Sequence, residues 1–415
     1  MSSVNSASPV GPGRIEFVLL VSVVMMIVAF AIDSMLPALP AIGSSLGVAD
    51  ESRWPLVISA FLAGFGVSQL FVGMLSDRYG RRSPILWAIF FFGVTSLAAS
   101  LAPTFEHLLV ARFVQGIGCA GARVIVTSIV RDRYAGREMA QVMSLASMVF
   151  MAAPILAPTM GQIVLAFATW RWIFAVLAMI GVAVWIWVMV RMPETLAPEN
   201  RTAISVASAI GSARIVVTDR MSLGYGLAIA VISCGLFGFL MSVQPIFQHV
   251  FERPDLLPVG FAVMASGMAG ASLVNAAIVR RFGMRKIGHA ALFFFTTVAG
   301  LHALVALSGH ETLTSFIVLQ TAMMMGFSLI AGNFGAMAME SMGHVAGMAS
   351  SLQGSVSSIA ASVIGAIIGG SFDGTTVPLY LGYCACGTVA LIIVFVTERG
   401  KFFVAHHAPP TGTGD

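Results

Sequence analysis

Residues 54–102 read WPLVISAFLAGFGVSQLFVGMLSDRYGRRSPILWAIFFFGVTSLAASLA, and this stretch decides the fold. It contains two apolar runs, over residues 54–75 and 85–102, separated by a short turn that carries most of its charge. Roughly 20 apolar residues is the length at which an α-helix crosses a ~30 Å hydrocarbon core. The stretch therefore predicts two membrane-spanning helices joined by a tight, charged turn.

The same pattern recurs along all 415 residues, of which 58% are hydrophobic and only 10% charged. Soluble domains are typically about 25% charged. A transmembrane barrel would show ~10-residue segments of alternating polarity, and the sequence has none. We expect an all-α polytopic membrane protein with twelve spans, at residues 16–36, 54–75, 85–102, 107–130, 139–160, 170–191, 223–249, 258–280, 288–308, 313–339, 345–370 and 377–397.

The distribution of basic residues predicts the orientation of these spans. The first apolar run is too long for the core of a signal peptide and is interpreted as a retained helix. Twelve spans place both termini on one side, and seventeen basic residues share that side: Arg14, Arg78, Arg81, Arg82, Arg131, Arg133, Arg137, Arg191, Arg201, Arg214, Arg220, Arg280, Arg281, Arg285, Lys286, Arg399 and Lys401. The other side receives Arg53, Arg171 and Arg253, while Arg112 and Arg123 lie within the fourth span. Cytoplasmic loops carry the excess of Lys and Arg, so both termini are expected in the cytoplasm.

The chain is expected to divide into two halves. Its longest internal polar stretch separates six spans from six, which predicts an N-terminal six-helix bundle at residues 1–192, a cytoplasmic linker at 193–222, a C-terminal bundle at 223–398 and a cytoplasmic tail at 399–415. The halves share a weak repeat, because Arg78-Tyr-Gly80-Arg81-Arg82 follows the second span and Arg281-Phe-Gly283-Met-Arg285 follows the eighth. Repeated halves are typical of transporters with a midplane substrate site between them.

Asp33 is the acidic residue well inside the first span. A charge at bilayer depth is costly unless it faces a cavity or a partner, so an intramembrane acid is a candidate functional residue. In an apolar cavity the carboxyl could hold a proton when empty and lose it when substrate arrives. Alternatively, Asp33 lies near the outer end of its helix, beside Pro37, and is simply hydrated or capping there.

Arg112 begins the stretch Arg112-Phe-Val-Gln115-Gly116-Ile-Gly118 on the fourth span. A guanidinium in the membrane must find an acid, carbonyl groups or water, and it could pass charge to a protonatable site. The alternative is an Arg whose side chain reaches toward the interface, with the glycines only allowing close helix packing.

Two further stretches suggest moving parts. Gly73-Met-Leu-Ser-Asp77-Arg78-Tyr-Gly80-Arg81-Arg82 sets an acid among three arginines in a tight turn, which could bind neighbouring helix ends and release them during motion. Positive-inside charge accounts for the arginines but does not require Asp77. Prolines in Ala153-Pro154-Ile-Leu-Ala157-Pro158-Thr-Met-Gly161 are expected to bend the fifth span, either as a gating hinge or as a static kink.

These stretches resemble the major facilitator superfamily, beginning with the loop signature at Gly73–Arg82. Several more are similar to its bicyclomycin/chloramphenicol-resistance (Bcr/CflA) branch of drug:proton antiporters: Asp33-Ser-Met-Leu-Pro37-Ala-Leu-Pro40, Arg112–Gly118, Val130-Arg131-Asp132-Arg133-Tyr134, Ala153–Pro158, Trp170-Arg-Trp-Ile-Phe174, Met192-Pro-Glu194-Thr-Leu196 and Asn333–Gly347. The resemblance covers nearly the whole chain.

The resemblance implies a role for each matching stretch. Asp33 would lie in a central cavity, Arg112 would couple protonation to conformation, and Asp77 with its arginines would stabilise the state closed to the cytoplasm. The stretch from Pro154 to Gly161 would match the antiporter motif, although it has Ala157-Pro158 and a single Gly161 where members often carry Gly-Pro and paired glycines. Further candidates for the cavity lining are Met26, Phe30, Phe237, Gln244 and Asn333.

Taken together, the sequence predicts a secondary active transporter that exports small drug-like molecules by proton antiport with alternating access. The alternatives are a proton-coupled exporter of a metabolite (a sugar, an amino acid or a siderophore) and a non-transporting membrane sensor. We expect no enzymatic activity and no cofactor, metal or nucleic-acid site. Neither Lys286 nor Lys401 lies in a phosphate-binding Gly-x-x-x-x-Gly-Lys string, and no His-Glu-x-x-His pair occurs. The expected partners are the substrate, protons and lipid, for a monomer in a bacterial inner membrane.

Overall fold

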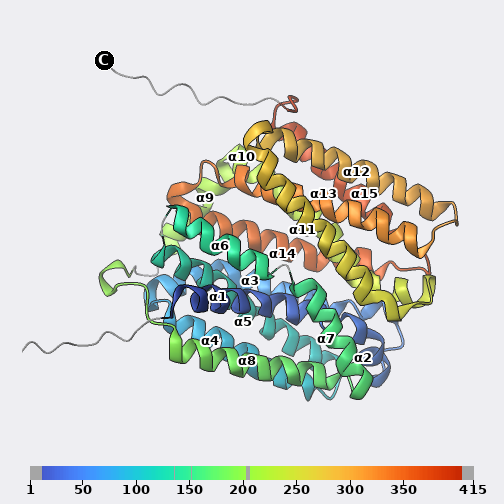
Figure 1. Ribbon diagram of the computed structural model, residues 1–415, viewed down its shortest axis with the longest axis horizontal. Coiled ribbons are helices and arrows are strands. Elements are labelled where there is room, and N and C mark those ends of the chain that lie inside the picture. Colours follow the sequence, from blue (N-terminus) through green and yellow to red (C-terminus); the bar gives the residue numbers. More distant parts are fainter. Residues whose placement is uncertain (1–11, 135, 151, 202–205, 404–415) are drawn as a thin grey trace, which may run out of the picture.

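The computed structural model describes residues 12–134, 136–150, 152–201 and 206–403. Within these residues the chain is helical and has no β-strand. Twelve segments of the described chain are long and apolar enough to span a membrane, which confirms the expected fold class (Figure 1). They run Arg14–Ser45, Glu51–Tyr79, Arg82–Ser100, Phe105–Arg133, Gln141–Phe167, Arg171–Arg191, Arg220–Val250, Pro254–Phe282, Met284–Leu307, Leu313–Met339, Ala346–Gly370 and Val377–Thr397.

Seven spans are single helices: α4 (Arg82–Ser100), α5 (Phe105–Arg133), α8 (Arg171–Arg191), α12 (Met284–Leu307), α13 (Leu313–Met339), α14 (Ala346–Gly370) and α15 (Val377–Thr397). The first span joins α1 (Arg14–Asp33), η1 (Leu36–Ala38) and α2 (Leu39–Ser45), and the second joins η2 (Glu51–Arg53) to α3 (Leu56–Tyr79). The seventh comprises α10 (Arg220–Pro245) and a π-turn, η4 (Ile246–Val250), and the eighth comprises η5 (Pro254–Leu256) and α11 (Leu257–Phe282).

The first span extends beyond the predicted boundary at residue 36. Pro37 and Pro40 occupy first-turn positions of η1 and α2, where a missing backbone N–H leaves no hydrogen bond unmade. The prolines therefore restart the helix instead of ending it, and the span continues to Ser45. Asp33 closes α1, with twelve further residues of the span beyond it.

The fifth span contains α6 (Gly136–Phe150) and α7 (Ala153–Phe167). Pro154 lies in the first turn of α7, and Pro158 lies within it. Proline interrupts a helix because it lacks the N–H and its ring meets the preceding carbonyl. The expected bend of the fifth span stays a prediction, and the structure places Pro154 at the start of α7 and Pro158 inside it.

Glycines bring neighbouring helices into backbone contact. A Cβ on Gly64 of α3 would lie 1.9 Å from the carbonyl oxygen of Phe113 of α5, and one on Gly116 of α5 would lie 2.1 Å from the carbonyl oxygen of Phe61. On α14, a Cβ on Gly365 would lie 3.2 Å from Phe237 Cβ of α10, and one on Gly369 would lie 2.5 Å from Met241 Cβ. Small residues allow this close packing where no hydrophobic effect drives helices together.

Both described chain ends lie at one end of the molecule, which we call the terminal end, since α1 begins there and α15 finishes there after twelve spans. The opposite, far end carries α2 and the end of α7, at the right in Figure 1. Between α8 and α10, the chain forms η3 (Pro198–Asn200) and α9 (Val206–Thr218) at the terminal end. We call α1 to α8 the first half and α10 to α15 the second half.

Polar contacts join the halves at the far end and midway along α3. At the far end, Gln162 Nε2 donates to the Pro254 carbonyl at 3.0 Å, and His249 Nε2 lies 3.5 Å from Glu51 Oε2. Deeper in, Ser59 Oγ lies 3.7 Å from Met241 Sδ, while midway Gln69 Nε2 donates to Ser358 Oγ at 3.2 Å. The halves thus contact each other both at the far end and midway along α3.

Candidate functional site

A cavity of about 1210 Å³ lies between the two halves. Along α3 it is lined by Leu62, Phe65, Gln69, Gly73 and Asp77, a spacing that places one helix face against it. At 1.5 Å per residue, the lining follows α3 for about 22 Å. It reaches the terminal end, where Asp77 lies, while the contacts described above close the far end.

Asp33 lies deep in this cavity, about 28 Å from the start of α1 at the helical rise. Its side chain is buried, with 7% of its surface exposed. Within the described residues its carboxylate has neither an ion-pair partner nor a hydrogen bond. Burial disfavours a charge that has no compensating partner. A proton or a bound cationic or hydrogen-bonding group can provide that compensation, and the cavity gives both access.

Arg112 lies elsewhere, inside the first half and outside the cavity lining. Its Nε donates to the Val57 carbonyl at 3.2 Å, and one terminal nitrogen donates to Gln115. The guanidinium also stands 4.6 Å from the Phe61 ring, a cation–π contact. The other terminal nitrogen is buried without a hydrogen-bond partner in the described part of the chain. Arg112 is thus held by carbonyl, amide and aromatic groups, and it does not touch Asp33.

The charged turn after α3 binds the ends of neighbouring helices. Arg81 is buried, with its Nε 2.8 Å from Asp132 at the end of α5 and a terminal nitrogen 2.5 Å from Asp77. Gly80 adopts φ +88°, a conformation that glycine allows at little cost. This arrangement lets the chain reverse between α3 and α4 while Arg81 joins α3 to α5.

Glu194, just after α8, binds the same turn. Four backbone N–H groups donate to its carboxylate at 2.8–3.3 Å, from Arg81, Arg82, Thr195 and Leu196. Partial burial disfavours the ionised form, but these hydrogen bonds outweigh it and hold the pKa of Glu194 below its ordinary value. The carboxylate therefore caps the start of α4.

The second half repeats this arrangement, as the weak sequence repeat suggests. Gly283, between α11 and α12, has φ +82°. Arg285 Nε then binds Glu398 at 3.0 Å, and Glu398 directly follows α15, as Glu194 follows the last span of the first half. In both halves an acid beyond the sixth span holds the turn between the second and third spans. Such repetition is a property of membrane transporters built from two related halves.

Comparison with known proteins agrees with this architecture. Residues 21–366 match the sequence pattern of the Major Facilitator Superfamily. The chain belongs to this superfamily. It is a transporter and not an enzyme.

Relatives of this superfamily member span almost its whole length. It is 30% identical to the uncharacterized MFS-type transporter YdgK of Bacillus subtilis, over 90% of this chain and 92% of that protein. It is 26% identical to the bicyclomycin resistance protein homolog of Haemophilus influenzae (92% and 96%), and 27% identical to the multidrug resistance protein MdtL of Klebsiella pneumoniae (88% and 91%). These relatives confirm the resemblance to the superfamily's drug:proton antiporters.

The fold also matches that of a solved transporter structure. The crystal structure of the human organic anion transporter MFSD10 (TETRAN) superposes with a TM-score of 0.65 at 17% identity, covering 93% of this chain and all of that one. At this identity the likeness concerns the fold alone.

The stretch that resembles the antiporter motif, from Pro154 to Gly161, packs against Ser34, the residue that follows Asp33. Pro154 lines the cavity, whereas Pro158 and Gly161 are buried behind it. A Cβ on Gly161 would lie 1.9 Å from the Ser34 carbonyl oxygen. This contact fixes α7 against the end of α1, one residue from the cavity's buried acid.

Of the other candidates for the cavity lining, only one lies at the cavity. Phe237 lines the cavity, whereas Met26, Phe30, Gln244 and Asn333 lie outside its lining. Gln244 instead donates to Gln248 at 2.7 Å, and Asn333 donates to Asn275 at 2.9 Å. Both amides therefore connect helices or turns within the second half.

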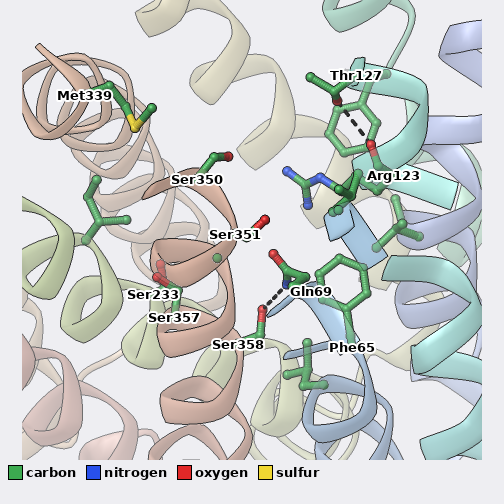
Figure 2. A pocket seen from close by; sticks show the side chains of 18 of the residues that line it. Phe65, Gln69, Arg123, Thr127, Ser233, Met339, Ser350, Ser351, Ser357 and Ser358 are labelled. Atoms are coloured by element: carbon green, nitrogen blue, oxygen red, sulfur yellow. Dashed lines mark hydrogen bonds between the residues drawn. The ribbon is translucent and has the colours of Figure 1, made fainter. Parts of the chain in front are cut away.

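Sequence reasoning missed several polar residues of the cavity wall. Figure 2 shows Gln69 of α3 bound to Ser358 of α14. Ser350 and Ser351 lie on the same helix, and Arg123 lies on α5, which faces it. The available signals were Gln69 within an apolar run and the many serines of residues 350–358. Serines in membrane helices also bond their own backbone, so their number alone does not identify a cavity.

Proposed function

We propose that this transporter exports small amphipathic or drug-like compounds in exchange for protons. The observation that carries the proposal is Asp33, a buried carboxyl without a polar partner among the described residues, in the cavity between the halves. The printed names of two relatives, a bicyclomycin resistance protein homolog and a multidrug resistance protein, support a drug-like cargo.

Exchange at Asp33 requires that proton and cargo stabilise the same site in turn. In the empty cavity, protonation removes the cost of a buried charge. A cargo that donates a hydrogen bond or carries positive charge stabilises the ionised carboxylate instead, so its binding displaces the proton. By linkage, protonation lowers the affinity for such cargo to the same extent. This reciprocity is the basis of antiport.

Alternating access requires the cavity to open at one end at a time. The described conformation is closed at the far end and its cavity reaches the terminal end, so it represents a state that loads cargo from the terminal side. We propose that the two halves, residues 1–192 and 223–398, rock as units about Asp33. We propose that the terminal end faces the cytoplasm, which the excess of basic residues supports, and the direction is then export across a bacterial inner membrane.

The charged turn is proposed to favour the state closed at the terminal end. Here Asp77 lines the cavity mouth and, among the described residues, is bound within its own half, to Arg81. Closure would bring the helix ends of the second half toward this turn. Arg112 is proposed to act through α3, since its Nε binds the carbonyl of Val57, two residues from the far-end contact residue Ser59.

The membrane potential makes this exchange productive without ATP. An inward elementary charge gains roughly 2.3 kcal/mol per 100 mV. At about 1.4 kcal/mol per decade, one proton can sustain on the order of a fifty-fold gradient of a neutral compound.

Proteoliposomes with an imposed pH gradient test the proposal. Wild type, Asp33→Asn and the matched control Asp50→Asn, an exposed loop acid, would be compared for uptake of chloramphenicol and a lipophilic cation. We expect uptake driven by the gradient in wild type and Asp50→Asn, and its loss in Asp33→Asn. Gradient-independent uptake by wild type would refute proton antiport, and an unchanged Asp33→Asn variant would refute the role of Asp33.

A further inference from the structure

We infer that Arg123 binds an acidic group of the cargo, so that the preferred substrates are amphoteric amphipaths carrying a carboxylate as well as a group that reaches Asp33. This inference rests on the proposed transport function and specifies its substrate class. It begins from the charges that line the cavity, which are Asp33, Asp77, Arg123 and Arg131.

Arg123 belongs to a face of α5 directed at the cavity. Arg123, Thr127 and Arg131 are spaced four residues apart, and all three line the cavity. Arg123 stands ten residues before the terminal end of α5, about 15 Å deep at the helical rise. The face therefore carries positive charge from the cavity mouth to its middle.

Figure 2 shows the guanidinium of Arg123 extending into the open space of the cavity. Gln69 of α3 lies beside it, and Ser350 and Ser351 of α14 lie across from it. Gln69 already links the halves through Ser358. The guanidinium thus stands where amide and hydroxyl groups from both halves can reach the same ligand.

Arg123 has no acid of its own within the described residues, and neither has Arg131 at the cavity mouth. Arg81 is bound by two carboxylates, and Arg191 binds Glu16 at 2.6 Å. Of the two cavity acids, Asp77 is bound to Arg81, which leaves Asp33 to balance two arginines. The uncompensated charge of the cavity is therefore positive, and it suits an anionic group.

The chemistry of this group follows from the guanidinium. Arginine presents paired N–H donors that match the two oxygens of a carboxylate. Apolar residues of the wall, among them Phe65, Phe237 and Phe327, accommodate the rest of an amphipath. A second group on the same molecule, one that donates a hydrogen bond or carries positive charge, would reach Asp33 and compete there with the proton. A cargo that has only an acidic group could not compete in this way.

Binding of matched ligand pairs to the purified full-length protein tests the inference. A panel of amphipathic amino acids with fluorescent side chains would be compared with the corresponding primary amides, which differ only in the acid. Since hydrogen bonds to charged groups contribute about 1.5–3 kcal/mol, we expect wild type to bind acids about ten- to a hundred-fold more tightly. Arg123→Gln should lose this preference, and Arg123→Lys should retain part of it.

The matched control Arg131→Gln separates a binding site from general electrostatics. Arg131 lies at the cavity mouth, so its replacement should leave most of the acid preference. Absence of acid preference in every pair, or a preference that survives Arg123→Gln, would overturn the inference.

A transport assay distinguishes failure of this inference from failure of the proposed function. Gradient-driven uptake of neutral chloramphenicol by wild type, together with no acid preference, would overturn the inference alone. Loss of chloramphenicol uptake in Arg123→Gln without any acid preference in wild type would assign Arg123 to the conformational change instead. Absence of gradient-driven uptake of every compound by wild type would refute the proposed function itself.

Discussion

Gly161 and Ser34 touch through their backbones: a Cβ at position 161 would lie 1.9 Å from the Ser34 carbonyl oxygen. Backbone cannot yield as a flexible side chain can, so any side chain here must push α7 away from the end of α1. Ser34 directly follows Asp33, and the contact therefore couples the fifth span to the proposed proton site.

We predict that Gly161→Ala impairs transport at least ten-fold and lowers Tm in detergent. Overpacking a close contact typically costs about 1–3 kcal/mol. Gly270→Ala is the matched control, because Gly270 also lies in a membrane helix and nothing stands within 4 Å of its Cβ position. Equal activity and Tm of the two variants would contradict the importance of the contact.

Substitutions of Asp132 and Asp77 should affect stability and transport to different extents. Both bind Arg81, but the Asp132 side chain is 15% exposed and that of Asp77 is 45% exposed. Asp132→Asn should therefore lower stability more, by about 1.5–3 kcal/mol as for hydrogen bonds to charged groups. Asp77→Asn should affect transport more than Tm. Thermal unfolding and uptake by both variants measure this, and the reverse order would count against the assigned roles.

Glu194→Gln should destabilise the turn between α3 and α4 in a pH-dependent manner. The pKa of Glu194 is lowered in the folded protein, so its ionised form stabilises the fold above the ordinary carboxyl range, and this contribution is lost as pH falls through the lowered pKa. Loss of a capping carboxylate typically costs about 1 kcal/mol. The Tm difference between wild type and variant should be full at pH 7 and shrink toward pH 4. A difference independent of pH would contradict this.

A cross-link between the halves at the far end should arrest transport. Ser59 Oγ lies 3.7 Å from Met241 Sδ, so Ser59→Cys with Met241→Cys can be joined by oxidation or a short thiol cross-linker. The four native cysteines, Cys119, Cys234, Cys384 and Cys386, are all free thiols and would be replaced by alanine. Uptake should vanish on cross-linking and return on reduction. Undiminished uptake by the cross-linked protein would exclude opening at the far end.

The sequence specified the spans and the tight turns because these depend on local properties. Apolar length determines where a helix can cross the bilayer, and Gly80 or Gly283 marks the turn that needs a positive φ. The missed boundary at Ser45 has a local cause too, since prolines at first-turn positions do not end a helix.

The residues that line the cavity could not be predicted from such local properties of the sequence. Membrane helices are apolar on lipid-facing and protein-facing sides alike, so the pattern does not tell which face of α5 meets the cavity. Arg112 and Arg123 lie three turns apart on α5, yet one is enclosed by Phe61, Val57 and Gln115 while the other faces open space. Only the packing of the helices separates these two environments.

Proton release on cargo binding tests the central claim most directly. Chloramphenicol, or whichever panel compound is transported best, would be added to purified wild type and Asp33→Asn in weakly buffered solution, and the pH of that solution followed. We predict that wild type releases protons on binding and Asp33→Asn does not, although it still binds the compound. Equal proton release by both proteins, or none from a wild type that binds, would contradict exchange of proton and cargo at Asp33.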